Sequence, residues 1–292
     1  MENFVAQKLS DQIVSGIKDF INSKHDTLAF YNQLIREDIL PLLDSQCTII
    51  YFPTEDKDNN GFHKTYRFHG ENKHFVYINT NQDIEKQIFT AAHELGHVWK
   101  VNRYIEKLLD TEINYELGER IINRFAAELL MPEVLFSKYL YKLFEEKLQN
   151  NKTMTVESII QIITSVMNEF YVPYKSVVYR MYELGFIHKN SAEILWDGTN
   201  ILSKETIINY SKRYANEQGY VRLYHPNKKR HIENLKDLLD VARKKSLVPQ
   251  RWLQEFYRRF SLNSDDTADS LKTTILVERD KEIIDNAGES SN

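Results

Sequence analysis

Hydrophobic residues recur every three or four positions through most of the chain, which predicts a largely helical protein. Residues 3–44 predict two amphipathic helices, the second of which ends near Pro41. The same spacing predicts five further helices, over residues 82–104, 115–130, 133–148, 156–171 and 175–184. Gly185 follows the last of these helices as a typical C-terminal cap. Residues 205–260 show the helical pattern more weakly.

One stretch after the first helices breaks the helical period. Residues 47–52, CTIIYF, are mostly β-branched or aromatic, as expected of a buried strand. Residues 65–70 and 74–80 have the pattern of two strands, and the polar GENK segment around their junction predicts a hairpin turn. The sequence therefore predicts an α+β fold in which a small sheet is inserted among helices.

Four segments are expected along the chain. Residues 1–45 form helices that pack on the core, and residues 46–190 form the central α+β domain. Residues 191–262 are a basic helical region. Residues 263–292 are polar and acidic, so we expect this end to be partly disordered.

Composition restricts the chemistry more than it changes the fold. The chain has 292 residues, 42% hydrophobic and 27% charged, which is typical of a soluble protein with one large domain or two modest ones. The net charge of −4 does not indicate a polyanion-binding protein as a whole. Cys47 is the only cysteine, which excludes a disulfide framework and a thiolate metal cluster. Any metal site must therefore be built from His, Asp and Glu.

Targeting signals are not evident. No run of about 18 apolar residues could span a membrane, so no membrane contact is expected. The first residues, MENFVAQKLSDQIV, lack the basic and then apolar pattern of a signal peptide. The expected location is the cytoplasm.

The segment IFTAAHELGHVWK, residues 88–100, carries His93, Glu94 and His97 in the order H-E-x-x-H. On a helix, positions i and i+4 lie on one face, so both imidazoles can bind one ion, for which Zn²⁺ is the expected cofactor. Glu94 lies near the open side of that ion and is predicted to act as the general base. The small Gly96 would let another element pack closely. Motifs this short also occur by chance as ordinary polar residues of a helix.

A catalytic zinc site requires a third protein ligand, and the helix predicted over residues 115–130 offers several glutamates. Glu119 continues the apolar face of that helix and is the favoured ligand. Glu116, one turn earlier, is the alternative. Glu128 falls on the other side, where we expect it to be solvated. Asn123, one turn after Glu119, is expected to hydrogen-bond a ligand histidine and orient it.

FTAAHELGH followed by ERIINRFAAELLMP resembles the ImmA/IrrE family of metallopeptidases, which are gluzincin-like H-E-x-x-H enzymes. In that family the motif helix is followed by a helix of the form E-x-E-A-N-x-F-A-x-x-L-L-M-P. This chain matches it at Glu119 and Asn123, and departs from it at Ile121, where a second Glu is usual, and at Ile122, where Ala is usual. The departure leaves Glu119 as the one family-like carboxylate. The resemblance covers about residues 47–188.

The resemblance implies a zincin-like minimal metallopeptidase domain over residues 46–190, with a small sheet packed on the motif helix and the glutamate helix, followed by a helical C-terminal region. It implies a zinc-dependent endopeptidase in which His93, His97 and Glu119 bind the metal and Glu94 is catalytic.

The resemblance also implies a substrate class, a transcriptional repressor of a mobile genetic element or of a stress response. Family members commonly carry a helix-turn-helix domain or are encoded beside such a repressor. Residues 1–45 show no such domain, so the expected partner is a separate helix-turn-helix protein encoded nearby. Its peptide is expected to pair as an added strand along residues 75–79. Tyr115 and Arg124 are candidates for stabilising the oxyanion.

Two other features bear on function. The segment from Lys204 to Phe260 carries 14 Lys or Arg against 6 Asp or Glu, a net charge of +8, with aromatic residues interleaved. This composition indicates nucleic-acid contact, or a basic face that meets the acidic end of the chain, where 8 acids and 3 bases give −5. The alternative function is therefore a non-proteolytic regulatory protein that docks a repressor or nucleic acid. An intact Glu94 favours the enzyme, because a binding protein needs no base there.

Three histidines, His63, His69 and His74, lie around the predicted hairpin. Their spacing matches no metal-binding pattern. We expect them to be surface residues, with the alternative that one of them approaches the active site.

Overall fold

The structure is a computed structural model, and the residues it describes are 8–24, 34–56, 58–68, 70–148, 154–197, 202 and 205–262. The chain divides into two compact units, Met1–Ile232 and Glu233–Asn292. The acidic end predicted over residues 263–292 lies outside the described residues.

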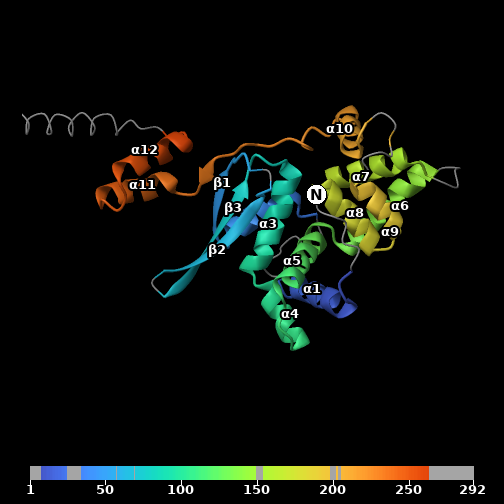
Figure 1. Ribbon diagram of the computed structural model, residues 1–292, viewed down its shortest axis with the longest axis horizontal. Helices are drawn as coiled ribbons and strands as arrows, with labels where there is room; N and C mark the ends of the chain where they lie inside the picture. The colour runs from blue at the N-terminus through green and yellow to red at the C-terminus, as the bar shows by residue number, and fades with distance from the viewer. Residues whose placement is uncertain are drawn as a thin grey trace, which may run out of the picture. The chain divides into compact units, whose positions relative to one another are not determined.

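The first unit is an α+β domain, as predicted, with a small sheet packed against helices (Figure 1). In its described residues the strands are β1 (Thr48–Phe52), β2 (Gly61–Phe68), β3 (Glu71–Asn79) and β4 (His231–Ile232). Its described helices are α1 (Asp11–Ser23), η1 (Arg36–Asp38), α2 (Ile39–Asp44), α3 (Ile84–Val98), α4 (Val101–Leu109), α5 (Tyr115–Leu130), α6 (Glu133–Leu148), α7 (Val156–Phe170), α8 (Tyr174–Glu183), α9 (Lys189–Asp197) and α10 (Ile207–Glu217).

The sheet has the strand order β2-β3-β1-β4. β2 and β3 form the predicted antiparallel hairpin, whereas β1 runs parallel to β3, with Ile49 opposite Val76. Among the described strands β2 pairs only with β3, so β2 is an edge strand and β3 is interior. The prediction that a peptide adds along residues 75–79 is therefore wrong, because neighbouring strands occupy both sides of that segment.

One face of the sheet and helix α5 both pack against α3, which lies between them (Figure 1). Val76 and Ile78 of β3 and Ile88 and Leu95 of α3 are almost fully buried. Burial of each such side chain stabilises the fold by about 1.5–3 kcal/mol. Gly96 allows α5 to approach, because a Cβ at this position would lie only 2.9 Å from Phe125 Cδ1. This close approach was predicted from the small residue, and it positions the chemistry described below.

The helix predicted over residues 82–104 is divided into α3 and α4. The chain turns at Lys100, whose φ of +58° is left-handed. After the turn, Val101 and Ile105 are fully buried, and Tyr104 lies edge-on to Phe20 of α1 at a centroid distance of 5.1 Å. A straight helix would carry these apolar side chains past the core, so the turn is favoured by their burial.

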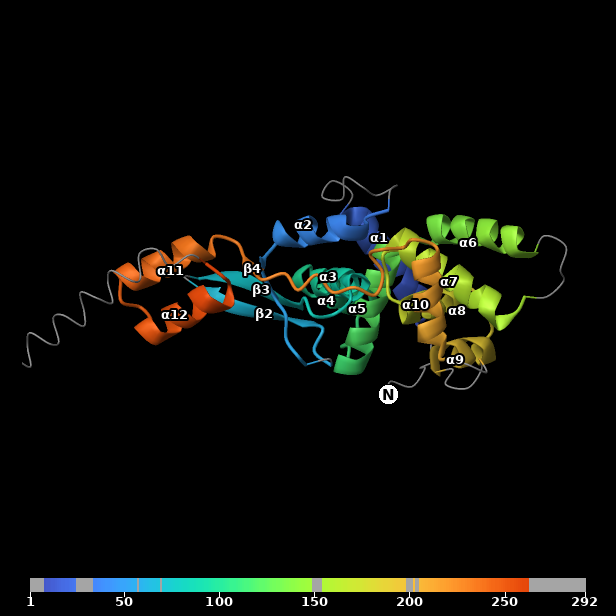
Figure 2. The ribbon, with the colours of Figure 1, turned by 90° about the horizontal axis from the view of Figure 1, so that it is seen from above.

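The basic region predicted over residues 191–262 is shared between the two units. α10 lies against α7 (Figures 1 and 2), and the chain then returns to the sheet, where β4 pairs antiparallel with β1. The Lys228 N–H donates to the Thr80 carbonyl at 3.0 Å, and the Ile84 N–H donates to the His225 carbonyl at 3.2 Å. These contacts cover the β1 edge and attach the segment to the start of α3, which explains why the first unit extends to Ile232.

The second unit contains α11 (Leu235–Lys244) and α12 (Gln250–Arg259) in its described part. Leu239 and Leu253 are buried in this unit, and the Tyr257 hydroxyl donates to Asp240 at 3.1 Å. In neither unit does a described helix have the length and apolarity needed to cross a membrane.

Candidate metal centre

Three side chains from two adjacent helices converge at one point: His93 and His97 from α3, and Glu119 from α5. The two histidine Nε2 atoms lie 3.1 Å apart. Glu119 Oε2 is 3.4 Å from His93 Nε2, and Glu119 Oε1 is 3.5 Å from His97 Nε2. The i, i+4 spacing brings the histidines together on one helix face, and the close approach at Gly96 brings Glu119 to them.

These three residues, called the metal centre below, fit a zinc ion. Ligand atoms at 2.0–2.1 Å from a tetrahedral zinc are separated by about 3.3 Å. The two Nε2 atoms are 3.1 Å apart, and each lies 3.4 or 3.5 Å from a different oxygen of the Glu119 carboxylate. Two imidazole nitrogens and one carboxylate are a donor set of catalytic zinc sites, which keep the fourth position open. The side chains of His93, His97 and Glu119 are 18%, 26% and 30% exposed, so a substrate can reach them.

Asn123 makes the contact predicted for it. Its Oδ1 lies 2.9 Å from His93 Nδ1. An amide oxygen can only accept, so Nδ1 carries the proton and Nε2 presents its lone pair to the metal centre. The hydrogen bond therefore selects the tautomer that can bind a cation.

Glu94 is a buried carboxylate beside this centre, with an exposed fraction of 5%. Burial raises the pKa of Glu94 to about 7, and Glu119 adds to this effect, whereas His93 opposes it. A carboxyl group with a pKa near neutrality can both accept and return a proton, which is the property that general acid–base catalysis requires.

The other candidates from the sequence are not among the three converging residues. Glu116, in the first turn of α5, is exposed and does not join the converging ligand atoms. Tyr115 is 83% exposed. Arg124 is buried, and its guanidinium contacts Glu128 at 2.7 Å and Glu183 at 3.3 Å, so it is bound within the core. No hydrogen bond among the described residues fixes the Tyr115 side chain, and the Arg124 side chain is held by two glutamates of the core.

The expectation that Glu128 is solvated is wrong. Glu128 is 8% exposed, and its Oε2 accepts hydrogen bonds from Arg124 and Arg180, both at 2.7 Å. Burial opposes its ionisation, but Arg180 and Arg124 together lower the pKa of Glu128. The pairing of Glu128 with Arg124 could be predicted from the sequence, because the two residues lie one helical turn apart. The pairing with Arg180 could not, because Arg180 belongs to α8.

Sequence reasoning missed the position of His63, which was expected at the surface. Its ring on β2 lies nearly parallel to that of His97, with 6.4 Å between centroids. Burial lowers the pKa of His63 to about 4, with smaller effects from His74 and His97, so the ring is neutral at neutral pH. His69 lies outside the described residues. The predicted strand began at residue 65, whereas β2 begins at Gly61, so alternation along the strand was not extended to His63.

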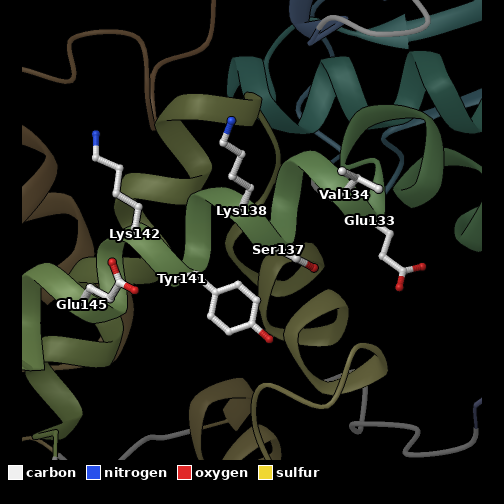
Figure 3. Close-up of a pocket in the computed structure, with 7 residues that line it drawn as sticks. All are labelled: Glu133, Val134, Ser137, Lys138, Tyr141, Lys142 and Glu145. Carbon is white, nitrogen blue, oxygen red and sulfur yellow. The ribbon is translucent and has the colours of Figure 1, made fainter.

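A shallow hollow of about 580 Å³ lies elsewhere, on the outer side of α6 (Figure 3). Its lining residues all belong to this single helix: Glu133, Val134, Ser137, Lys138, Tyr141, Lys142 and Glu145. None of them belongs to the metal centre. Because no second element closes over it, the hollow is a feature of one helix surface and not a binding pocket.

Comparison with known proteins agrees with this geometry. Residues 44–182 match the family model of Peptidase M78, described as the IrrE N-terminal-like domain. The matched segment contains α3, α5 and all three residues of the metal centre. No curated protein matches the chain.

Proposed function

From the premise that residues 44–182 belong to the M78 peptidase family, we propose that the chain is a zinc-dependent endopeptidase. His93, His97 and Glu119 are its metal ligands, and Glu94 is its general base. The observation that carries the proposal is the convergence of two imidazole nitrogens, 3.1 Å apart, with the Glu119 carboxylate, of which one oxygen lies within 3.5 Å of each nitrogen. A buried carboxylate, Glu94, lies next to them.

Each residue has a defined task in amide hydrolysis. A bound zinc supplies a Lewis acid that polarises the carbonyl and makes water nucleophilic at neutral pH. His93 and His97 present their Nε2 lone pairs, and Asn123 keeps the proton on His93 Nδ1. Glu94 takes a proton from the attacking water as the C–O bond forms, and returns it to the nitrogen as the C–N bond breaks.

Edge strand β2 is the proposed docking site for the substrate peptide. Its unpaired side can accept an added strand, held by main-chain hydrogen bonds. At Gly61 this strand runs close to α3, since a Cβ there would lie 2.6 Å from Thr90 Cγ2. A peptide paired with β2 therefore passes along the helix that carries His93 and His97.

The general base is tested by comparing the wild type with Glu94→Gln, using a synthetic peptide library and mass spectrometry of its cleavage products. We expect a loss of rate of about 10²- to 10⁴-fold, with one zinc per chain in both proteins. Glu146→Gln, an exposed site on α6, is the control and should leave the rate unchanged. Cleavage by Glu94→Gln at the wild-type rate would contradict the assignment.

The finer proposal is that the substrate is a helix-turn-helix repressor encoded nearby, controlling a mobile genetic element or a stress response in the cytoplasm. Its support is the family resemblance of the motif helices. The test is to incubate the zinc-loaded protein with the product of the neighbouring repressor gene and to map fragments by mass spectrometry. A single cleavage that Glu94→Gln fails to make supports the proposal. An intact repressor with both proteins contradicts it.

The alternative function, a regulatory protein that binds nucleic acid, is favoured by the net charge of +8 over residues 204–260. The pair between Arg222 and Glu37 offsets part of that charge, because Glu37 lies outside the segment. The acids that contact Arg213 and Arg258 lie within it and are already counted in the net charge. Binding of a labelled DNA duplex, with an affinity that falls steeply as salt rises, would support this function.

A further inference from the structure

The β2–β3 hairpin presents three polar side chains on the face that meets α3. His63 pairs in register with the fully buried Val76, and Thr65 pairs with His74. Phe62 and Lys64, on either side of His63 in the sequence, lie on the opposite face, because strand side chains alternate. The hairpin therefore delivers two imidazoles and a hydroxyl to the side of the sheet where the metal centre lies.

The His63 ring is held from several directions. Its Nε2 lies 2.8 Å from His74 Nδ1. The Thr65 hydroxyl is 3.2 Å from both of these nitrogens. The ring planes of His63 and His97 differ by only 15°, at a centroid distance of 6.4 Å. A ring fixed in this way has already lost its rotational freedom, which lowers the entropic cost of a further contact.

One nitrogen of His63 remains for such a contact. Within the described part of the chain, His63 Nδ1 has no hydrogen-bond partner. A contact between two neutral imidazoles needs one ring to donate and the other to accept. When His74 Nδ1–H donates to His63 Nε2, the proton of His63 lies on Nδ1, where it can be donated to an oxygen atom.

We propose that His63 is a substrate-binding catalytic residue, whose Nδ1–H donates a hydrogen bond to the carbonyl oxygen of the cleaved peptide bond. His74 and Thr65 are positioning residues that hold the ring and select its tautomer. This role rests on the proposed function, since it assumes that a peptide lies at the metal centre. His63 supplies there the donor that neither the exposed Tyr115 nor the buried Arg124 provides, and preorganised donors of this kind stabilise the developing oxyanion.

The test uses the zinc-loaded full-length chain and two probes. A peptidyl phosphonamidate carries the tetrahedral, anionic oxygens of the transition state, whereas acetohydroxamate binds the metal with few other contacts. Dissociation constants for both probes and the bound zinc are measured for the wild type, His63→Ala, His63→Gln and His74→Ala. His188→Ala, which removes an exposed histidine just before α9, is the matched control.

We expect His63→Ala to keep one zinc and its acetohydroxamate affinity, and to bind the phosphonamidate about 10- to 100-fold more weakly. His63→Gln retains an N–H donor and should recover most of the affinity. His74→Ala should show a smaller loss of the same kind, and His188→Ala should match the wild type. A purely structural role would not separate the two probes in this way.

Two results would overturn the inference alone: equal phosphonamidate affinity in His63→Ala and the wild type, or loss of zinc in His63→Ala, which would make His63 a support of the metal. A wild type that binds neither zinc nor acetohydroxamate would instead overturn the proposed function, and this inference with it. If thermal unfolding shows that His63→Ala is not folded, the affinities of His63→Gln and His74→Ala for the two probes are compared with those of the wild type. A phosphonamidate affinity that is unchanged in His74→Ala would then overturn the inference.

Discussion

Helix α5 takes part in two charged clusters that differ in how their charges are balanced. The metal centre, formed by His93, His97 and Glu119, lies at its first half. The ion cluster lies at its second half and joins two arginines to two glutamates from α5 and α8: Arg124, Glu128, Arg180 and Glu183. Both clusters hold a carboxylate against nitrogen atoms at short distance.

In the ion cluster the protein itself balances the charges. Arg180 is fully buried, and it donates to Glu128 at 2.7 Å and to the Met131 carbonyl at 3.1 Å. In the metal centre, by contrast, two imidazole nitrogens and a carboxylate converge with no arginine or lysine among them. Buried charges that are paired internally indicate a structural role, whereas converging acceptors indicate a site for a cation from outside.

The largest effect should follow from breaking the metal centre. Two ligands are too few for a stable zinc site, so His97→Ala and Glu119→Ala should fall from one zinc per chain to none. Glu116→Ala should retain its zinc. Metal content measured by mass spectrometry on purified protein checks this, and loss of zinc from Glu116→Ala with retention in Glu119→Ala would reverse the ligand assignment.

Breaking the ion cluster should affect folding instead of metal content. Glu128→Ala leaves two buried arginines, Arg124 and Arg180, with Glu183 as the remaining carboxylate of the cluster. One buried charge is then uncompensated, which costs about 3–5 kcal/mol. Urea denaturation measures the change in the free energy of unfolding. The matched control is Glu146→Ala, whose carboxylate forms an exposed pair with Lys142 at 3.8 Å and should contribute less than about 1 kcal/mol. Equal costs at the two sites would contradict the distinction.

A smaller effect is expected at Asn123, which contacts the metal centre without belonging to it. Asn123→Ala removes the acceptor at 2.9 Å from His93 Nδ1, and loss of such an orienting contact weakens metal affinity about 10- to 100-fold. Competition with a chelator measures the zinc affinity, and the stoichiometry at saturation should stay at one. Asn216→Ala, exposed on α10, serves as the control. Unchanged affinity in Asn123→Ala would show that the hydrogen bond does not orient the ligand.

Glu85 differs from the carboxylates of both the metal centre and the ion cluster, because its buried carboxylate faces a backbone N–H. The Tyr224 N–H lies 3.2 Å from Oε2, and burial raises the pKa of Glu85 from 4.5 to about 7. The stability that protonated Glu85 contributes is fully present below the pKa that Glu85 has in the unfolded chain. It is lost as the pH rises through the pKa of Glu85 in the folded protein. Glu85→Gln lacks this titration.

The free energy of unfolding of the wild type, relative to Glu85→Gln, should therefore fall between about pH 5 and pH 7, by at most about 1.4 kcal/mol per pH unit. Urea denaturation of both proteins across this range provides the measurement. A difference that does not change with pH would show that Glu85 is charged in the folded protein at all these values.

Features determined by local periodicity could be predicted from the sequence. α5 spans the predicted residues 115–130. The predicted hairpin forms, although β2 begins at Gly61 instead of residue 65, and residues 71–73 of the predicted turn belong to β3. His93 and His97 share a helix face by the geometry of one helical turn, and Asn123 lies one turn from Glu119 for the same reason. Each of these relations involves residues close in sequence, so no distant contact was needed to establish them.

Contacts between distant segments were decided only by the tertiary structure. The parallel pairing of β1 with β3 makes β2 the edge strand, and β4 arrives at the sheet from far along the chain. Arg180 of α8 turns Glu128 from an expected surface residue into a buried one, and the hairpin brings His63 beside His97. Sequence periodicity identifies which side of an element is buried but not what covers it, because that choice depends on the packing of the whole domain.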